Sequence, residues 1–254
     1  MRRLLAVVIA AAAMLAGGPA TAQRLVASTS DPEVSIDSTF TGEKITLFGA
    51  IEPRRDEAEV PPGTYNIVIA ISGPAADRVT RLKEQVLGIW FNRKQVRFTK
   101  FPTFFWMISS APLAQIADAE TLAAERLTFD GQTRLAAGDG EPMAEEFGAE
   151  LIRLMQERGL FGIEERGVQF LSSRFYTARI DLPAFVPNGN FLARTLLFRD
   201  GEVVAARSDG FTVRTAGIER FIADAARNQS LLYGLVCVLL ALGTGWLGGV
   251  AFRR

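Results

Sequence analysis

The side chains that most often carry catalysis are scarce in this chain of 254 residues. It contains no histidine, and its one cysteine, Cys237, falls in an apolar run near the C-terminus. Ser-His-Asp and Cys-His arrangements and histidine-based zinc sites are therefore excluded. No G-x-x-x-x-G-K-[ST] phosphate loop occurs either. Carboxylates, hydroxyls, basic residues and aromatic rings remain, and they imply no cofactor.

One helix-forming stretch carries a dense group of carboxylates. Its glutamates could form an acidic pair for general acid–base catalysis, as in a carboxylate-based hydrolase: Glu145, Glu146, Glu150 and Glu157. Exposed glutamate is also the default on the outer face of a helix. We therefore expect a solvated face here and no enzymatic activity.

Five aromatic residues lie close together in a strand-like region and could stack on a sugar ring: Trp90, Phe91, Phe104, Phe105 and Trp106. Aromatic residues are favoured in strands and dominate cores by the area they bury. We expect these five to pack in a sheet or in the core of a sandwich.

Charge is unevenly distributed, although the formal net charge is zero. Residues 77–100 carry seven basic and two acidic side chains, and residues 118–165 carry twelve acidic and four basic ones. The two segments could lie against each other and cancel. The basic segment could instead form a patch for an anionic ligand or lipid headgroup, with Arg78, Arg81 and Arg97, or could contact a partner protein. The zero net charge gives no reason to expect nucleic acid.

The elements that would position these residues are mainly strands. Residues 33–40 and 45–51 alternate in polarity, and residues 65–73 are apolar on both faces, which is typical of a central strand. The aromatic-rich runs 85–92 and 95–110 predict a hairpin that turns near Arg93 and Lys94. Three strands follow Gly167, at residues 175–183, 190–198 and 202–214, and Asp200-Gly201 predicts a tight turn between the last two.

Two helices are expected between these groups of strands, at residues 112–127 and 143–158, with Gly159 as a stop and a loop over residues 129–142. Eight short strands predict an immunoglobulin-like or fibronectin-like β-sandwich with a helical insertion. The sandwich would comprise residues 23–110 and 167–215, and the insertion residues 111–166. Two small stacked domains are the alternative.

The apolar run at residues 231–252 predicts a transmembrane helix. It has 22 residues without a charge, which as a helix reach about 33 Å, enough to cross a hydrocarbon core of about 30 Å. Residues 1–22 have the pattern of a cleaved secretory signal, with an uncleaved anchor as the alternative. We expect a periplasmic domain, a juxtamembrane segment at residues 216–230, one inner-membrane span, and residues 253–254 in the cytoplasm.

Small residues recur within this span at Ala241, Gly245 and Gly249. Small residues at a four-residue spacing let a second helix approach closely, in a second copy or in another membrane protein. Glycine is also common in transmembrane helices, so an anchor without a partner is the alternative. Cys237 is expected to be inert.

The order of segments resembles a family of uncharacterised transmembrane proteins of alphaproteobacteria. The likeness covers nearly the whole mature chain and rests on these segments: FTGEKITLFGAI, YNIVIAISGP, VLGIWFNRKQVRFTKFPTFFWMISSAPL, FYTARIDLPAFVPNGNF, LLFRDGEVV and GIERFIADAARNQSLLYGL, with the ending GWLGGVAFRR. The resemblance implies a signal peptide, an exported domain, one C-terminal anchor and no known catalytic residues. Genes of this family often lie beside one for a sulfite- or taurine-exporter-like permease, which implies an accessory role.

Three functions follow from these patterns. We expect a non-enzymatic accessory or assembly factor for an integral membrane partner. An anchored binding module for an anionic ligand or envelope component is the alternative, and a carboxylate-based hydrolase is a remote third.

Overall fold

The computed structural model describes residues 24–36, 41–53, 62–86, 88–137, 143–215, 222 and 225–251. The predicted signal peptide and the predicted cytoplasmic tail lie outside the described residues, and so does part of the predicted juxtamembrane segment.

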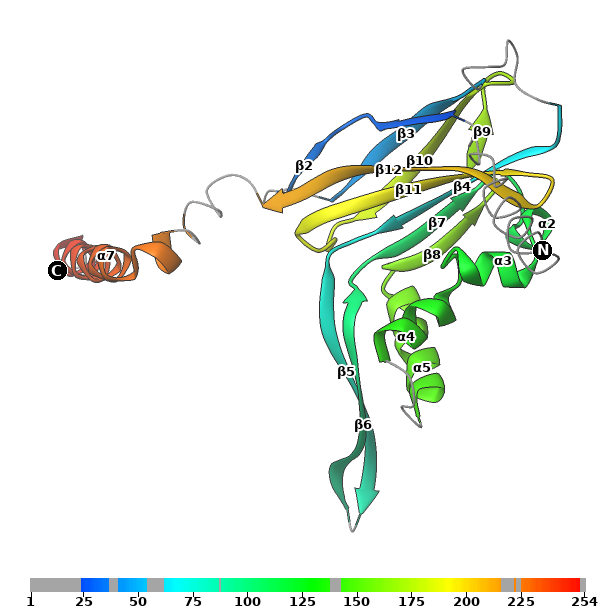
Figure 1. Cartoon of the computed structure of the whole chain (residues 1–254). Coiled ribbons are helices and arrows are strands. Elements are labelled where there is room, and N and C mark those ends of the chain that lie inside the picture. Colours follow the sequence, from blue (N-terminus) through cyan, green and yellow to red (C-terminus); the bar gives the residue numbers. More distant parts are fainter. Residues whose placement is uncertain are drawn as a thin grey trace, which may run out of the picture.

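Strands dominate the described chain and form a sandwich of two sheets (Figure 1). The first sheet is antiparallel and has the order β1 (Arg24–Thr29), β3 (Gly42–Glu52), β10 (Phe175–Pro183) and β9 (Val168–Phe170). The second sheet has the order β2 (Glu33–Ile36), β12 (Glu202–Thr215), β11 (Gly189–Arg199), β4 (Tyr65–Ser72), β7 (Phe105–Ser109) and β8 (Phe161–Glu165). The predicted β-sandwich is confirmed.

Both sheets contain strands from before and after the helical region. β3 pairs with β10, and β4 pairs with β11. The two halves of the sequence therefore form one sandwich and not two stacked domains. The second sheet also has parallel pairs, β2 with β12 and β7 with β8, and an immunoglobulin-like or fibronectin-like identity stays a prediction.

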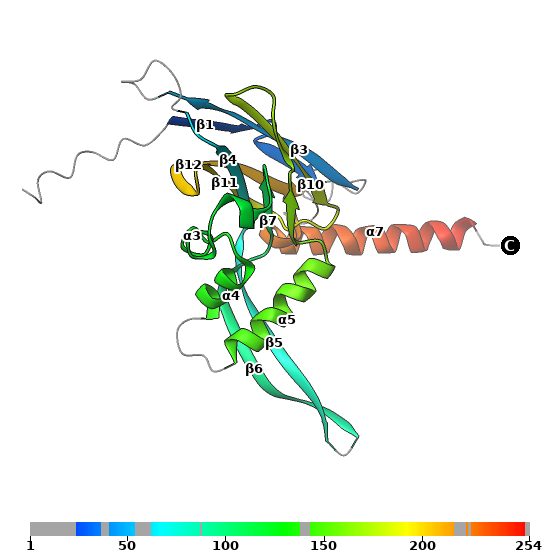
Figure 2. The ribbon, with the colours of Figure 1, turned by 90° about the vertical axis from the view of Figure 1, so that its right-hand side faces the viewer.

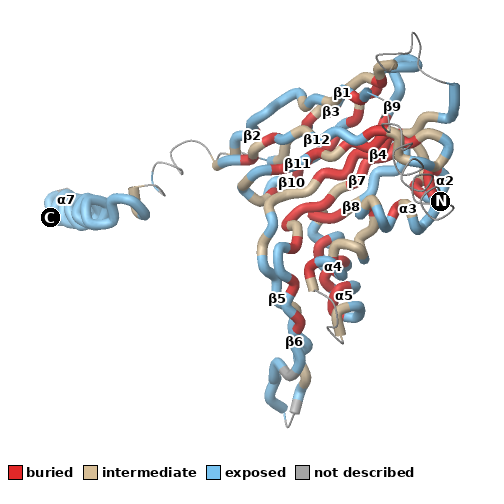
Figure 3. The backbone as a smooth tube through the Cα atoms, viewed as in Figure 1, coloured by how far each residue is buried: buried red, intermediate tan, exposed pale blue. Residues whose placement is uncertain are grey.

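β4 is buried on both faces, as its uninterrupted apolar run predicts. Ile67, Ile69 and Ile71 are fully buried. Ile69 and Ile71 lie opposite Thr195 and Ala193 of β11. These two β11 residues lie across from Tyr176 and Leu47 of the first sheet, so this face of β4 is turned toward the inside of the sandwich. The opposite face of the second sheet contacts the helices, where Phe105 packs edge-on against Phe129. Figure 3 shows the buried residues concentrated along these strands.

The helical region contains α2 (Leu113–Ile116), α3 (Ala119–Ala124), α4 (Phe129–Ala137) and α5 (Ala144–Glu157). The helix expected over residues 143–158 is confirmed as α5, and Gly159 adopts a positive φ of 64° just beyond it. The single helix expected over residues 112–127 is wrong. The Asp118 carboxylate accepts a hydrogen bond from the Thr121 backbone N–H at 2.7 Å, so it caps a separate helix, α3.

The loop expected over residues 129–142 is also wrong, because α4 occupies its first part. The Phe129 ring lies 6.1 Å from that of Phe105 and 5.8 Å from that of Phe161, and Thr133 and Ala136 are buried. These long-range contacts stabilise a helix whose sequence is locally ambiguous. The end of the expected insertion is likewise not helical, since β8 pairs there with β7.

The hairpin predicted to turn near Arg93 and Lys94 turns elsewhere. β5 (Ala75–Val86) and β6 (Ile89–Pro102) are joined at Gly88, whose φ is 82°, and Lys94 lies inside β6, opposite Leu82. A glycine adopts this positive φ without steric strain, whereas arginine and lysine rarely do. The hairpin is therefore longer than expected and projects from the sandwich (Figure 1).

α7 (Ser230–Ala251) confirms the C-terminal apolar helix and stands apart from the sandwich (Figure 1). None of its most apolar 18-residue window is buried against the rest of the described protein. Its apolar surface therefore has no partner among the described elements.

Candidate functional site

The β5–β6 hairpin divides into two halves with different surroundings. Its base is closed by hydrogen bonds between its two sides: the Thr103 hydroxyl donates to the Pro74 carbonyl at 2.7 Å and the Lys100 backbone N–H donates to the Asp77 carboxylate at 3.2 Å. Above the base, Val96 and Phe98 are buried. We call residues 75–80 and 96–102 the proximal half, which packs against α4 and α5.

The remaining part, residues 81–86 and 88–95, is the distal half, and it extends past the helices (Figure 2). Three consecutive apolar residues are exposed at its tip: Ile89 is 60% exposed, Trp90 63% and Phe91 49%. The core packing predicted for Trp90 and Phe91 is therefore wrong. Core packing is confirmed for Phe104 and Phe105, which are buried, and Trp106 packs partly buried against the core.

The basic residues predicted to form a patch all lie on this hairpin, but on different faces. The register places Arg97 opposite Val79, and Arg81 opposite Gln95, two residues further along the strands. Arg81 and Arg97 therefore share one face, and Arg78, opposite Phe98, lies on the other. All three side chains are exposed. Two pockets among the described residues lie elsewhere: Arg166 and Arg179 help to line one, and Asp118 and Asp200 help to line the other.

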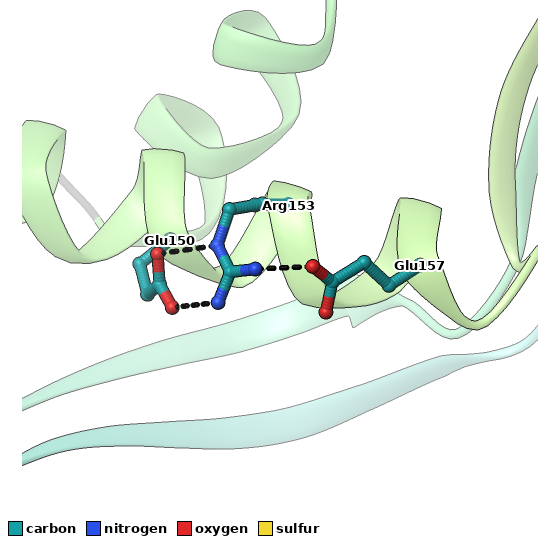
Figure 4. A network of polar contacts seen from close by, with 3 residues as sticks. All are labelled: Glu150, Arg153 and Glu157. Atoms are coloured by element: carbon teal, nitrogen blue, oxygen red, sulfur yellow. Dashed lines mark hydrogen bonds and ion pairs between the residues drawn. The ribbon is translucent and has the colours of Figure 1, made fainter.

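The acidic helix α5 lies beside the basic hairpin, where it contacts β5. Two of its carboxylates are also paired within the helix (Figure 4): the Arg153 guanidinium donates to the Glu150 carboxylate with Nε at 2.9 Å, and its Nη1 bonds to Glu157. The bond with Arg153 lowers the pKa of Glu150 below its ordinary value. A general acid needs the opposite shift. The structure therefore gives Glu150 a surface ion-pair environment, while Glu145 and Glu146 lie in the first turn of α5, apart from this network.

A second ion pair, which the sequence did not indicate, joins the sandwich to the helical region. Arg194 of β11 donates through Nη1 to the Glu125 backbone carbonyl at 2.9 Å, and its Nη2 bonds to the Glu125 carboxylate. Both side chains are about one-third exposed or less. Because Glu125 directly follows α3, this contact fixes the end of that helix against the second sheet.

The described residues contain no group of three acidic or cysteine side chains that could hold a metal ion. The described part of the chain thus offers two prominent surfaces: the distal half of the hairpin and the exposed helix α7.

The small residues predicted as a packing stripe lie on α7. Ala241, Gly245 and Gly249 are all exposed, and a Cβ built on either glycine would meet no atom within 4 Å. Thr244 turns its hydroxyl back onto the helix and donates to the Leu240 carbonyl at 2.8 Å. The stripe is therefore open to a partner, and none of the described elements covers it.

The fold and this helix define a class of protein, a β-sandwich domain with a C-terminal membrane anchor. Within the described residues, Ser230–Val250 is the one helix long and apolar enough to cross a bilayer. The chain belongs to the alphaproteobacterial family described as Putative transmembrane protein (Alph_Pro_TM), whose model matches residues 24–254. The resemblance inferred from the sequence is thereby confirmed. A comparison with curated proteins found no match.

Proposed function

We propose that this protein is a non-enzymatic accessory or assembly factor for an integral membrane partner, such as a sulfite- or taurine-exporter-like permease. In this proposal α7 anchors the protein in the inner membrane, and the sandwich lies in the periplasm. The orientation is supported by the signal-like residues 1–22 and by Arg253 and Arg254 beyond the span, which fit the positive-inside tendency.

The observation that carries the proposal is the open stripe on α7. Apolar contact alone gives helices little reason to associate in lipid, because the acyl chains are equally apolar. Close backbone approach across small residues provides the missing attraction, and Ala241, Gly245 and Gly249 offer such a surface. The described parts of the protein leave this surface uncovered.

The absence of enzymatic activity is part of the same proposal. It is supported by the lack of histidine in the sequence and by the ion pairs that hold Glu150 and Glu157 on the surface of α5. A carboxylate-based hydrolase would instead place two facing carboxylates in a cleft.

Affinity purification of the full chain from detergent-solubilised membranes, at native expression, tests the accessory role. We expect an integral membrane protein to co-purify and the double variant Gly245→Leu/Gly249→Leu to lose it, with an association weaker by about 1–2 kcal/mol. Both replacements keep the length of the span and raise its hydropathy, so the variant should still insert.

A matched control is available on the same helix. Gly243 lies two residues from Gly245, about 200° around the helix, so Gly243→Leu makes the same chemical change on the opposite face. Crosslinking in membranes should detect association with Gly243→Leu but not with Gly245→Leu. Equal association in both variants, or co-purification of no membrane protein, would contradict the proposal.

A second candidate is an anchored binding module for an anionic ligand, favoured by the shared face of Arg81 and Arg97. In that case a soluble anion such as inorganic phosphate should raise the melting temperature of the full chain. The variant Arg81→Ala/Arg97→Ala should abolish that increase, whereas Arg207→Ala on β12 should retain it.

A further inference from the structure

The tip of the β5–β6 hairpin exposes apolar side chains on both of its faces. Ile89, Trp90 and Phe91 are consecutive strand residues, so Trp90 projects to one face and its two neighbours to the other. A flat protein surface would cover one face of such a hairpin and leave the other in water. A bilayer interface surrounds an inserted tip and covers both faces.

We propose that this tip inserts into the interface of the anionic bilayer that α7 spans, and so gives the protein a second membrane contact. Tryptophan suits this environment, because its amphipathic ring is enriched at the headgroup level of membranes. The apolar tip covers three residues of strand, about 10 Å at about 3.3 Å per residue. This length matches the depth of about 5–10 Å to which interfacial apolar segments are buried.

Basic side chains lie directly behind the apolar tip. Lys83 is opposite Asn92, the residue that follows Phe91, and Lys94 lies two residues further along β6. Their charges would therefore stand about 3–10 Å behind the apolar residues, at the level of the lipid phosphates. Between residues 78 and 99 there are six basic residues and one acidic residue, Glu84. This balance favours anionic lipid over a neutral surface.

The chain also permits the tip and the anchor to reach one membrane. Only 14 residues lie between Thr215, at the end of β12, and Ser230, at the start of α7. Such a segment spans at most about 50 Å, so the sandwich stays close to the bilayer. The 12 residues of β5 reach about 40 Å, which lets the hairpin bridge the remaining distance.

This inference is independent of the proposed accessory role, which rests on α7. The only residues that it shares with the second candidate function, the binding of an anionic ligand, are basic residues of the hairpin. Interfacial insertion would fix the orientation of the sandwich above the bilayer. A single covalent connection to α7 does not by itself fix that orientation.

The test uses the full chain in lipid nanodiscs, with no other protein present. Cys237→Ser removes the one cysteine, and Asn92→Cys then carries an environment-sensitive fluorophore beside the intact tip. Ser173→Cys, in an exposed loop of the sandwich, provides the matched control position. In discs that contain phosphatidylglycerol, lipids with brominated acyl chains should quench the probe at residue 92 but not the probe at residue 173. Equal responses at the two positions would overturn the proposal.

Two sets of variants separate the apolar and the electrostatic contributions. Trp90→Ser/Phe91→Ser should abolish quenching at residue 92, whereas Phe185→Ser, at a residue that is similarly exposed outside the hairpin, should leave it unchanged. Each basic residue lost should weaken insertion about fivefold. Lys83→Glu/Lys94→Glu should therefore weaken it strongly, whereas Arg207→Glu on β12 should not.

The remaining outcomes also decide the matter. A tip that stays in water in pure lipid, but crosslinks to a protein in native membranes, would assign it to a protein partner and overturn the lipid proposal. Stabilisation of the chain by soluble phosphate, without insertion of the tip, would likewise overturn the lipid proposal. The basic residues of the hairpin would then be assigned to the binding of a soluble anion, as in the second candidate function.

Discussion

Gly49 lies in the middle of β3, which pairs with β1 on one side and with β10 on the other. A Cβ at this position would lie 2.1 Å from the backbone oxygen of Val26 and 2.3 Å from the hydroxyl of Tyr176. The first of these contacts is with backbone, so a side-chain rotation cannot relieve it. A residue without a side chain is therefore required here for steric reasons.

We expect Gly49→Ala to lower the free energy of unfolding by about 1–3 kcal/mol, as overpacked cores do. Gly210→Ala on β12 is the matched control, because its Cβ would meet the nearest atom at an ordinary 3.5 Å. Chemical unfolding of both variants in detergent measures the difference. Equal stabilities would show that β1 can move aside at no cost.

Tyr176 lies between the two sheets with 1% of its surface exposed, and its hydroxyl donates to the Val26 carbonyl at 3.4 Å. Burial raises the pKa of Tyr176 from 10.0 to about 12. Between these values the unfolded chain has lost the phenolic proton and the folded chain keeps it. Its contribution to stability is therefore complete below pH 10 and is lost as the pH rises to 12.

We expect the wild type to lose about 2–3 kcal/mol from this group between pH 10 and 12, at about 1.4 kcal/mol for each unit of pKa difference. Tyr176→Phe lacks the ionising group and should lose less stability over the same range. Unfolding of both proteins at pH 8 and pH 12 tests this expectation. Parallel loss of stability in the two proteins would show that another group controls the alkaline transition.

At the scale of elements, the hairpin combines a structural half with a free half. Phe98 in the proximal half is fully buried, with its ring 6.2 Å from that of Phe101, whereas Trp90 in the distal half is 63% exposed. Two large aromatic residues eight positions apart on one strand thus have opposite environments. The packing of α4 and α5 against the proximal half makes the difference.

Phe98→Ala should therefore destabilise the protein by about 3–5 kcal/mol, because it leaves a cavity under the helices. Trp90→Ala should change the stability by less than about 0.5 kcal/mol, as exposed substitutions do. Chemical unfolding of the full chain in detergent measures both values. A large loss for Trp90→Ala would mean that the tip packs against another part of the chain.

At the scale of the whole molecule, the anchor and the sandwich are joined by a short segment, so the orientation of α7 decides on which side of the membrane the sandwich lies. With the proposed orientation, protease added to spheroplasts should digest the sandwich and leave a short stub that contains α7. A cytoplasmic protein in the same sample should stay intact as a control. A sandwich protected until the membrane is lysed would contradict the periplasmic placement.

The sequence by itself determined the features that depend on local properties. α7 was predicted within about one residue of its described ends, because length and hydropathy suffice to define a span when the bilayer is the solvent. β4 and α5 were predicted for a similar reason. A run that is apolar on both faces indicates a buried central strand, and an apolar stripe at helical spacing indicates a helix with one buried face. The family was also recognisable from residue order alone.

Only the tertiary structure decided which side chains meet. The helix at residues 129–137 forms because Phe129 packs against Phe105 and Phe161, which are distant in sequence. The hairpin turns at Gly88, so its register separates Arg78 from Arg81 and Arg97. The same register places Trp90 and Phe91 beyond the reach of α4 and α5, although their composition suggests a core. Burial depends on what other elements cover a residue, and a strand's own sequence does not contain that information.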